Sequence, residues 1–549
     1  MENTRAMTSA VLDAAHVGDI RGALGTIKLT DSQHEPKLMQ RLKMLLAILG
    51  PGLIVMVGDN DAGAFSTYAQ AGQNYGTTLL WTLALLIPVL YVNQEMVLRL
   101  GAVTGVGHAR LILERFGRFW GAFSVIDLFL LNALTIVTEF IGIALGLDYL
   151  GIPRIVGVGI AAMLVMVAAG TGDFRRFERF ALSLVLGSLV LLPLFVMVHP
   201  PMGQLVRDFA TVQLPKDAKL SDVMLLIIGI VGTTVAPWQL FFQQSYVIDK
   251  RITPRFIRYE RLDLWLGIVL VVLGAVALIS LVAFCFAGKP EFGAFADALA
   301  VAKGLAHYHG HWAGTLFALA LIDASVIGAA AVSLSTAYAV GDVLSMNHSL
   351  HRKPGEAKGF YFVYCGLIVL AAALVLLPGV PLGLLTNAVQ TLAGVLLPSA
   401  SVFLLLLCND KQVLGPWVNG KLTNAFTSAV VAVLVILSTV LTAAVAFPDI
   451  SEDQIIAILV GGGVLTAVIG LSTLAVRAYR LAAPSLGAAA PGSETTQPMV
   501  LWRMPPLHTL APAPLTPSTR LWMGVLRLYL FVAVVMAIVR VLQLALAHA

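Results

Sequence analysis

Long apolar stretches separated by short polar segments make up most of the chain. Twelve of them approach or exceed the roughly 20 residues that cross a bilayer, and they fall near residues 45–71, 76–98, 121–147, 155–171, 180–199, 222–247, 262–287, 312–341, 360–378, 382–408, 425–447 and 454–476. A thirteenth run, 521–546, contains Arg527 and Arg540 and is either an extra span or an interfacial helix. The pattern predicts an all-α integral membrane protein.

Composition supports this class and excludes others. Of 549 residues, 58% are hydrophobic and 12% are charged, whereas about a quarter of an ordinary soluble domain is charged. So few charges cannot cover a water-facing surface, which excludes a cytosolic enzyme, a disordered protein and a coiled coil. Cys285, Cys365 and Cys408 lack CxxC spacing, and there is no nucleophile elbow, phosphate loop or HExxH motif. We therefore expect neither an enzyme nor a bound cofactor.

The distribution of positive charge predicts the orientation. Of the 35 Lys and Arg residues, 27 fall on the side of the twelve-span core that contains both of its ends, and 6 fall on the other side. By the positive-inside rule the N-terminus is cytoplasmic, in a multi-pass protein that we expect in a prokaryotic plasma membrane. The net charge of +5 then reflects topology, so we expect the lipid bilayer as surroundings, no nucleic acid and no obligatory protein partner.

The predicted organisation has four parts. Residues 1–44 form a cytoplasmic N-terminal segment, and residues 45–478 form the twelve-span core. Within the core, 45–199 and 222–408 are two five-span halves, and 425–478 contains spans 11 and 12. Residues 479–520, rich in Pro, Ala, Ser and Thr, form a cytoplasmic linker, and 521–549 form an extra C-terminal helix.

Polar and helix-breaking residues interrupt two spans at bilayer depth. The first span contains Gly58-Asp59-Asn60-Asp61, and the sixth contains Gly232-Thr233-Thr234-Val235-Ala236-Pro237. Buried acids are costly in a membrane, and proline removes a backbone donor. Because these spans occupy corresponding positions in the two halves, the pattern predicts an inverted-repeat transporter with a midplane site. Two acids and freed carbonyl oxygens favour a hard divalent cation.

At these residues the sequence resembles the NRAMP family of divalent-metal transporters. The stretch from Gly50-Pro51-Gly52 through Asp61-Ala62-Gly63-Ala64 to Gln70-Ala71-Gly72 resembles the family's GPG…DPGN…QAG segment. Residues 232–238 resemble GATVMPH, residues 175–178 resemble RKLE, and residues 390–398 and 414–419 resemble its tenth-span and following loop motifs. The resemblance runs in order from about residue 45 to 425. It implies the LeuT-like fold, with two inverted five-helix repeats plus additional C-terminal helices.

The resemblance and the breaks together give a set of candidate site residues. Those expected around the metal are Asp61, Asp59, Asn60, Thr233 (through its carbonyl), Ala236 and Gln390. Those expected to shape the site are Ala64, Gly63, Pro237, Trp238 and Gln243. Asp323 and Glu139 are possible residues of the ion path; for Asp323 the alternative is a structural acid satisfied by neighbouring hydroxyls, such as those of Ser325 or Ser333, or by a basic partner. Asp263 is expected at the interface near Arg258 and Arg261.

Departures from the family pattern bear on the substrate. Ala64 replaces an asparagine, Ala236 replaces the methionine whose thioether favours softer metals, and Trp238 and Gln243 stand where the family has histidines. These changes enlarge the site and leave oxygen ligands, which suits partly hydrated Mg²⁺. In this respect the chain is most similar to the NRAMP-related magnesium transporter branch. The ninth-span arginines linked with proton movement are also missing.

We therefore predict a secondary transporter that moves divalent cations by alternating access, with Mg²⁺ favoured, Mn²⁺ also accepted, and no proton coupling. The metal is the transported substrate. One alternative is a proton-coupled Mn²⁺ or Fe²⁺ importer of the main NRAMP type. A more distant alternative is a cationic amine or amino-acid transporter of the same fold.

Overall fold

The structure is a computed structural model. It describes residues 15–28, 38–215, 218–378, 400–447, 450–482, 498–510, 512–513 and isolated positions at 382, 385–386, 389 and between 523 and 535. Most of the predicted tenth span and of the run 521–546 lies outside the described residues, as does Gln390.

Within these ranges, nine helical stretches are long and apolar enough to span a membrane. They are α4 (Trp81–Thr104), α6 (Arg118–Tyr149), α8 to α9 (Phe174–Val198), α11 to α12 (Leu220–Asp249), η4 to α13 (Pro254–Phe286), α15 (His311–Val343), α16 (Lys358–Val375), α19 (Lys421–Ala446) and α20 (Glu452–Ala482). The pair α1 (Leu38–Ile48) and α2 (Pro51–Val57) passes the same test together, bent by 46°, and leads into α3 (Ala62–Tyr75). The shorter apolar α7 (Arg154–Gly170) corresponds to the predicted fourth span. The all-α membrane class is confirmed.

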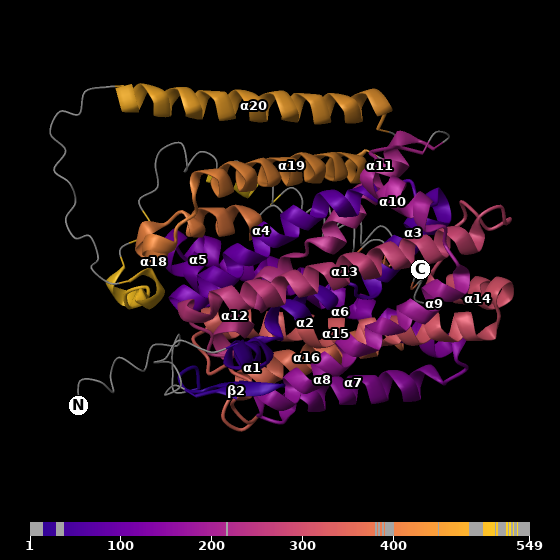
Figure 1. Cartoon of the computed structure of the whole chain (residues 1–549), viewed down its shortest axis with the longest axis horizontal. Helices are drawn as coiled ribbons and strands as arrows, with labels where there is room; N and C mark the ends of the chain where they lie inside the picture. The colour runs from indigo at the N-terminus through magenta and orange to yellow at the C-terminus, as the bar shows by residue number, and fades with distance from the viewer. Residues whose placement is uncertain are drawn as a thin grey trace.

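Helices α15 and α6 pack against each other most extensively, and α13 packs against α2 and α3. The close approach of α13 and α2 depends on glycine, because a Cβ on Gly52 would lie 2.7 Å from the backbone of Leu264. Figure 1 shows α19 beside the bundle and α20 outermost. Only 6% of the apolar window within Glu452–Ser472 of α20 is buried, so this part of the helix packs little against the rest of the described protein.

One end of the bundle carries a feature that the sequence analysis does not predict. Residues of the N-terminal segment form a small antiparallel hairpin, β1 (Ile20–Gly22) with β2 (Gly25–Ile27). Arg175 of α8 donates to the carbonyl of Gly22 at 2.9 Å, and the backbone amide of Ala23 donates to Glu178 at 2.5 Å. We call this end of the bundle the hairpin end.

The opposite end is closed by shorter helices, α10 (Met202–Ala210) and α14 (Ala298–His309). Thr77, after α3, donates to Asp208 of α10 at 2.6 Å. Trp81 donates to the carbonyl of Gln213 at 2.8 Å. Connections of this kind fix the two ends independently of each other.

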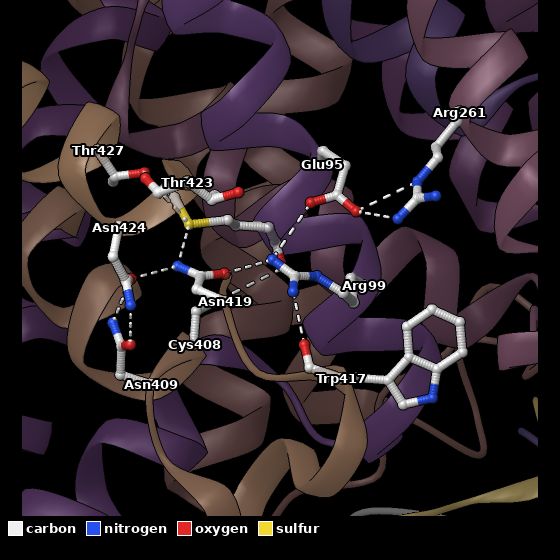
Figure 2. Close-up of polar contacts among 11 residues, drawn as sticks. Glu95, Arg99, Arg261, Cys408, Asn409, Trp417, Asn419, Thr423, Asn424 and Thr427 are labelled. Carbon is white, nitrogen blue, oxygen red and sulfur yellow. Dashed lines mark hydrogen bonds and ion pairs between the residues drawn. The ribbon is translucent and has the colours of Figure 1, made fainter. Parts of the chain in front are cut away.

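Near the hairpin end, a polar cluster joins α4, α13 and the segment after α18 (Lys411–Leu414), as Figure 2 shows. Glu95 accepts from Arg99 at 3.2 Å and from Arg261 at 2.6 Å. Arg99 also donates to the carbonyl of Trp417 at 2.5 Å and to the side-chain oxygen of Asn419 at 2.6 Å. Charge-assisted hydrogen bonds are the stronger ones, so this cluster binds helices of the two halves to a loop beyond them.

Candidate metal site

The first break lies where the sequence predicts it. Helix α2 ends at Val57 and α3 begins at Ala62, which leaves Gly58 to Asp61 outside both helices. Asp61 caps α3, and its carboxylate accepts from the backbone amide of Ala64 at 2.8 Å. Asp59 is fully buried, and Asp61 is only 3% exposed. Both acids therefore lie inside the bundle, at the junction of two half-helices.

The second break separates α11, which ends at Thr234, from α12, which begins at Pro237. Ala236 between them is extended, with φ −84° and ψ 143°. In a continuous helix the carbonyl of Thr233 would accept from the amide of residue 237, but a proline has no N–H to donate. The sequence thus frees the carbonyl of Thr233 at the position where a ligand carbonyl is expected.

Two side-chain contacts connect the breaks. Gln239 of α12 donates to Asp59, and its own oxygen accepts from Gln94 of α4 at 2.9 Å. The hydroxyls of Tyr68 on α3 and Thr234 on α11 lie 2.8 Å apart. Gln94 and Gln239 are not predicted as site residues from the sequence. The only feature of the sequence that could have indicated them is that each is a polar amide within an apolar helix.

Glu139 of α6 joins the first break. Its carboxylate accepts from the amide of Ala62 at 3.1 Å and interacts with Asp61. Both acids face Gly328 of α15, where an added Cβ would lie 2.6 Å from Glu139 Oε2 and 3.0 Å from the Cβ of Asp61. The glycine makes room for two carboxyl groups side by side.

Several buried oxygen atoms at the breaks have no hydrogen-bond partner among the described residues. They are Asp59 Oδ2, Asn60 Oδ1, Glu139 Oε1 and Thr233 Oγ1. Buried polar atoms normally have partners, so the absence of partners for these atoms at the two breaks is a property that a ligand would explain. Ala236 adds no sulfur, and oxygen donors are those that hard divalent cations prefer.

The residues expected to shape the site lie at both breaks. Trp238 is 1% exposed, and its ring lies 3.6 Å from the position of a Cβ on Gly58. The carbonyl of Trp238 accepts from Ser335 at 2.8 Å. Gln243 is fully buried, and within the described part of the chain neither polar atom of its amide has a partner. Gly63 and Ala64 lie in the first turn of α3, which Asp61 caps.

Asp323 does not lie in either break, but it shares a cavity with the first one. This cavity of about 130 Å³ is lined by Asp323, by Asn60 of the first break, and by Ser188 and Gly274. Ser325 instead donates to the carbonyl of Leu321 at 2.6 Å, and Asp323 Oδ2 has no partner among the described residues. The alternative that neighbouring serines satisfy this acid is therefore wrong, while its place on an ion path remains a prediction.

Asp263 requires a correction. It is fully buried and binds the start of α2, whereas we expect it near Arg258 and Arg261. It accepts from the backbone amides of Gly50 at 3.1 Å and Gly52 at 2.7 Å. These are orphan donors at the start of α2, so Asp263 caps the half-helix from a neighbouring span. The sequence could not show this, because the cap lies 213 residues away from Gly50.

Comparison with known proteins agrees with this geometry. Residues 52–444 match the model of the family described as Nramp, natural resistance-associated macrophage protein-like. A divalent metal cation transporter MntH of Ralstonia nicotianae is 29% identical over 410 residues, covering 71% of this chain and 89% of that protein. The MntH of Yersinia enterocolitica is 26% identical, covering 74% and 96%.

Solved structures show the same fold. The crystal structure of the Eremococcus coleocola manganese transporter in complex with an aromatic bis-isothiourea substituted compound matches with a TM-score of 0.61 and 22% identity. The match covers 82% of this chain and 98% of that one. The predicted LeuT-like fold is thereby confirmed. Since the family model matches most of its length, this chain belongs to the Nramp family.

Proposed function

We propose that this chain is a secondary transporter that moves divalent metal cations across a membrane by alternating access. The observation that carries the proposal is the set of partnerless buried oxygen atoms of Asp59, Asn60, Glu139 and Thr233 at the two helix breaks. The substrate class also has support from relatives whose names describe divalent metal cation and manganese transporters.

We further propose Mg²⁺ as the favoured ion, with Mn²⁺ also accepted. Ala236 and Ala64 leave space and bring no sulfur, and Mg²⁺ prefers oxygen ligands and retains waters. In this proposal Asp61, Asp59, Asn60 and the carbonyl of Thr233 bind the ion, and Gln390 contacts a metal-bound water. The residues that shape the site are Gly63, Pro237, Trp238 and Gln243, with Glu139 and Asp323 along the path.

In the transport cycle that we propose, α2 is the half-helix that moves. The hairpin end is cytoplasmic in this proposal, in a prokaryotic plasma membrane. The ion enters from the opposite end and binds between the breaks. Helix α2, held at its start by Asp263 and by Lys250, then moves away from these contacts and releases the ion toward the hairpin end.

The test is uptake of Mg²⁺ into liposomes that contain the purified protein and a trapped Mg²⁺-sensitive dye. Asp61→Ala should abolish uptake. The matched control Asp222→Ala removes an exposed carboxylate from the first turn of α11 and should leave uptake unchanged. Equal uptake by Asp61→Ala and the parent would contradict the proposal. A trapped pH dye should report no acidification, as expected for uncoupled transport.

A second candidate is a proton-coupled importer of Mn²⁺ or Fe²⁺. Two observations favour it: the manganese transporter structures among the relatives and the ionisable Glu139 beside Asp61. Competition separates the two. Strong inhibition of uptake by the soft ion Cd²⁺, together with acidification of the liposome interior, would support this second function over the first.

A further inference from the structure

A pocket of about 230 Å³ lies at the hairpin end, where three segments far apart in the sequence meet. Lys28 follows the hairpin, Arg251 and Arg255 come from the connection between α12 and α13, and Arg503 follows η6 (Met499–Leu501). None of the described residues that line the pocket carries a carboxylate. Four cations thus converge on one concavity without an acid in its wall.

Arg251 is held rigidly in this wall. Its backbone adopts the left-handed region with φ 67°, which costs energy for a non-glycine residue. Its guanidinium donates to the carbonyls of Ala15 at 2.7 Å and Asp19 at 3.2 Å. It lies so close to Gly18 that an added Cβ there would be 2.8 Å from Nη1. The strain and the close approach fix one cation at the pocket, rather than leaving it to extend into solvent.

The C-terminal segment that contributes Arg503 to the pocket is also held by hydrogen bonds. Trp417 donates to the carbonyl of Met499 at 2.8 Å, and Trp417 is itself bound by Arg99 in the cluster of Figure 2. The amide of Met504 donates to the carbonyl of Val103 at 3.4 Å, and Arg503 donates to the carbonyl of Ala102 at 3.2 Å. The C-terminal segment is therefore docked on the end of α4, which holds Arg503 beside the other cations.

Two acids lie near Arg251 but do not line the pocket. Asp249 and Asp19 attract Arg251, while Arg21 repels it. The carboxylate of Asp249 accepts from Ser349 at 2.5 Å and from Tyr338 at 2.6 Å. Among the described residues no carboxylate lines the wall that these cations share, so an anion bound there would lower their mutual repulsion.

We propose that this pocket binds a phosphate group carried on a small organic stem, supplied either by a soluble phosphate ester or by the headgroup of an anionic phospholipid. Arginine recognises phosphate through paired, charge-assisted hydrogen bonds, and the hydroxyl of Thr253 adds a further donor to the wall. Phe256, Val500 and Leu501 supply an apolar side for the stem. The volume is below the roughly 300 Å³ at which drug-sized ligand pockets begin, so it suits a phosphate and the few carbons next to it.

A general excess of cations at this end of a membrane protein would also place Lys and Arg here. That explanation predicts that every nearby cation contributes equally to anion binding. Arg258 is the matched control, because it is exposed on α13 one turn after Arg255 and does not line the pocket. Arg255 is the most informative variant, because it lines the pocket, is exposed, and makes no side-chain hydrogen bond or ion pair within the described part of the chain.

The experiment uses the full-length protein in two arms. In the first, protein in detergent is titrated with glycerol 3-phosphate by calorimetry. In the second, protein in phosphatidylcholine nanodiscs with or without phosphatidylglycerol is examined by native mass spectrometry, which counts the retained phosphatidylglycerol. Saturable binding in the first arm identifies a soluble ester, and selective retention in the second identifies a lipid headgroup.

Arg255→Gln and, separately, Arg503→Gln should weaken binding about tenfold, as expected from losing one charge-assisted bond. Arg258→Gln should stay within about twofold of the parent. Unchanged melting temperatures of the variants show that the fold is intact. Absence of binding by the parent in both arms, or equal weakening by Arg255→Gln and Arg258→Gln, would overturn the proposal. Neither result bears on metal transport, which depends on residues at the helix breaks.

Discussion

Lys250, directly after α12, donates to Glu178 of α8 at 2.6 Å, and both side chains are completely buried. The same ammonium group donates to the backbone carbonyls of Ile48 at 2.5 Å and Leu49 at 3.0 Å, just before α2 begins. The second oxygen of Glu178 accepts from Ala23 of the hairpin. One ion pair thus connects the second broken span, the first broken span and the N-terminal hairpin.

Lys250→Met should lower the free energy of unfolding by about 3 kcal/mol, because removing one partner leaves Glu178 as an uncompensated buried charge. The double variant Lys250→Met/Glu178→Gln should recover part of this loss. Chemical denaturation in detergent measures both, with Lys358→Met, an exposed lysine at the start of α16, as the control. Additive losses in the double variant would show that the two residues do not act as a pair.

Gly328→Ala should impair transport more than stability. The new methyl group would meet the carboxylate of Glu139 and the Cβ of Asp61. Overpacking of this kind costs about 1–3 kcal/mol, which corresponds to a loss of about fivefold to 150-fold in uptake when it displaces the two carboxyl groups. Liposome uptake is the measurement. Gly366→Ala on α16, where no atom lies within 4 Å of the added Cβ, should behave as the parent.

Ala236→Met should shift selectivity toward softer ions. A thioether at this position adds a soft ligand and fills space. We expect Cd²⁺ to compete with Mg²⁺ uptake about tenfold more strongly than in the parent, which corresponds to about 1.4 kcal/mol. Competition curves in liposomes measure the change. An unaltered ratio of Cd²⁺ to Mg²⁺ affinity would show that residue 236 does not face the ion.

Stability should depend on pH through His348, which follows α15 and lies 3.1 Å from Asp342. Burial alone lowers the pKa of His348, but the hydrogen bond and charge of Asp342 outweigh it, so the pKa lies above its ordinary value. The folded state therefore holds the proton more tightly than the unfolded state. This stabilisation is complete below the ordinary pKa of about 6.5 and is lost as the pH rises through the raised value.

Melting temperatures between about pH 6 and pH 9 test this dependence, and they should fall as the pH rises through the raised His348 pKa. Asp342→Asn should remove much of the slope. His307→Gln, at an exposed histidine of α14, should keep it. A parent whose melting temperature rises over the same range would contradict the assignment. Asp249 and the ring of His16 also lie near His348, so Asp342→Asn should leave a residual slope.

Both breaks could be predicted from the sequence because their cause is local. Acids and glycine in the first span, and proline at position 237 in the sixth, disrupt a helix wherever the chain goes. Asp59 and Asp61 were therefore found, and the structure buries both. The resemblance to a known family added Thr233 and Glu139, which no local pattern singles out.

The residues that were missed act through distant partners. Asp263 caps α2 across more than two hundred positions, and Gln239 reaches Asp59 across 180. Such pairings depend on which helices become neighbours, and helix periodicity does not determine that. The hairpin was missed because its strands are three residues each, too short for an alternating pattern to appear.

The β-hairpin makes the beginning of the chain part of what keeps one end of the bundle closed. Ala23 and Lys250 both bind Glu178, whose side chain is fully buried, so detaching the hairpin would remove one of the contacts of this carboxylate. A peptide tag or fusion partner attached ahead of residue 15 would therefore alter how readily this end opens. Rates measured on tagged protein would then describe the attachment as well as the transporter.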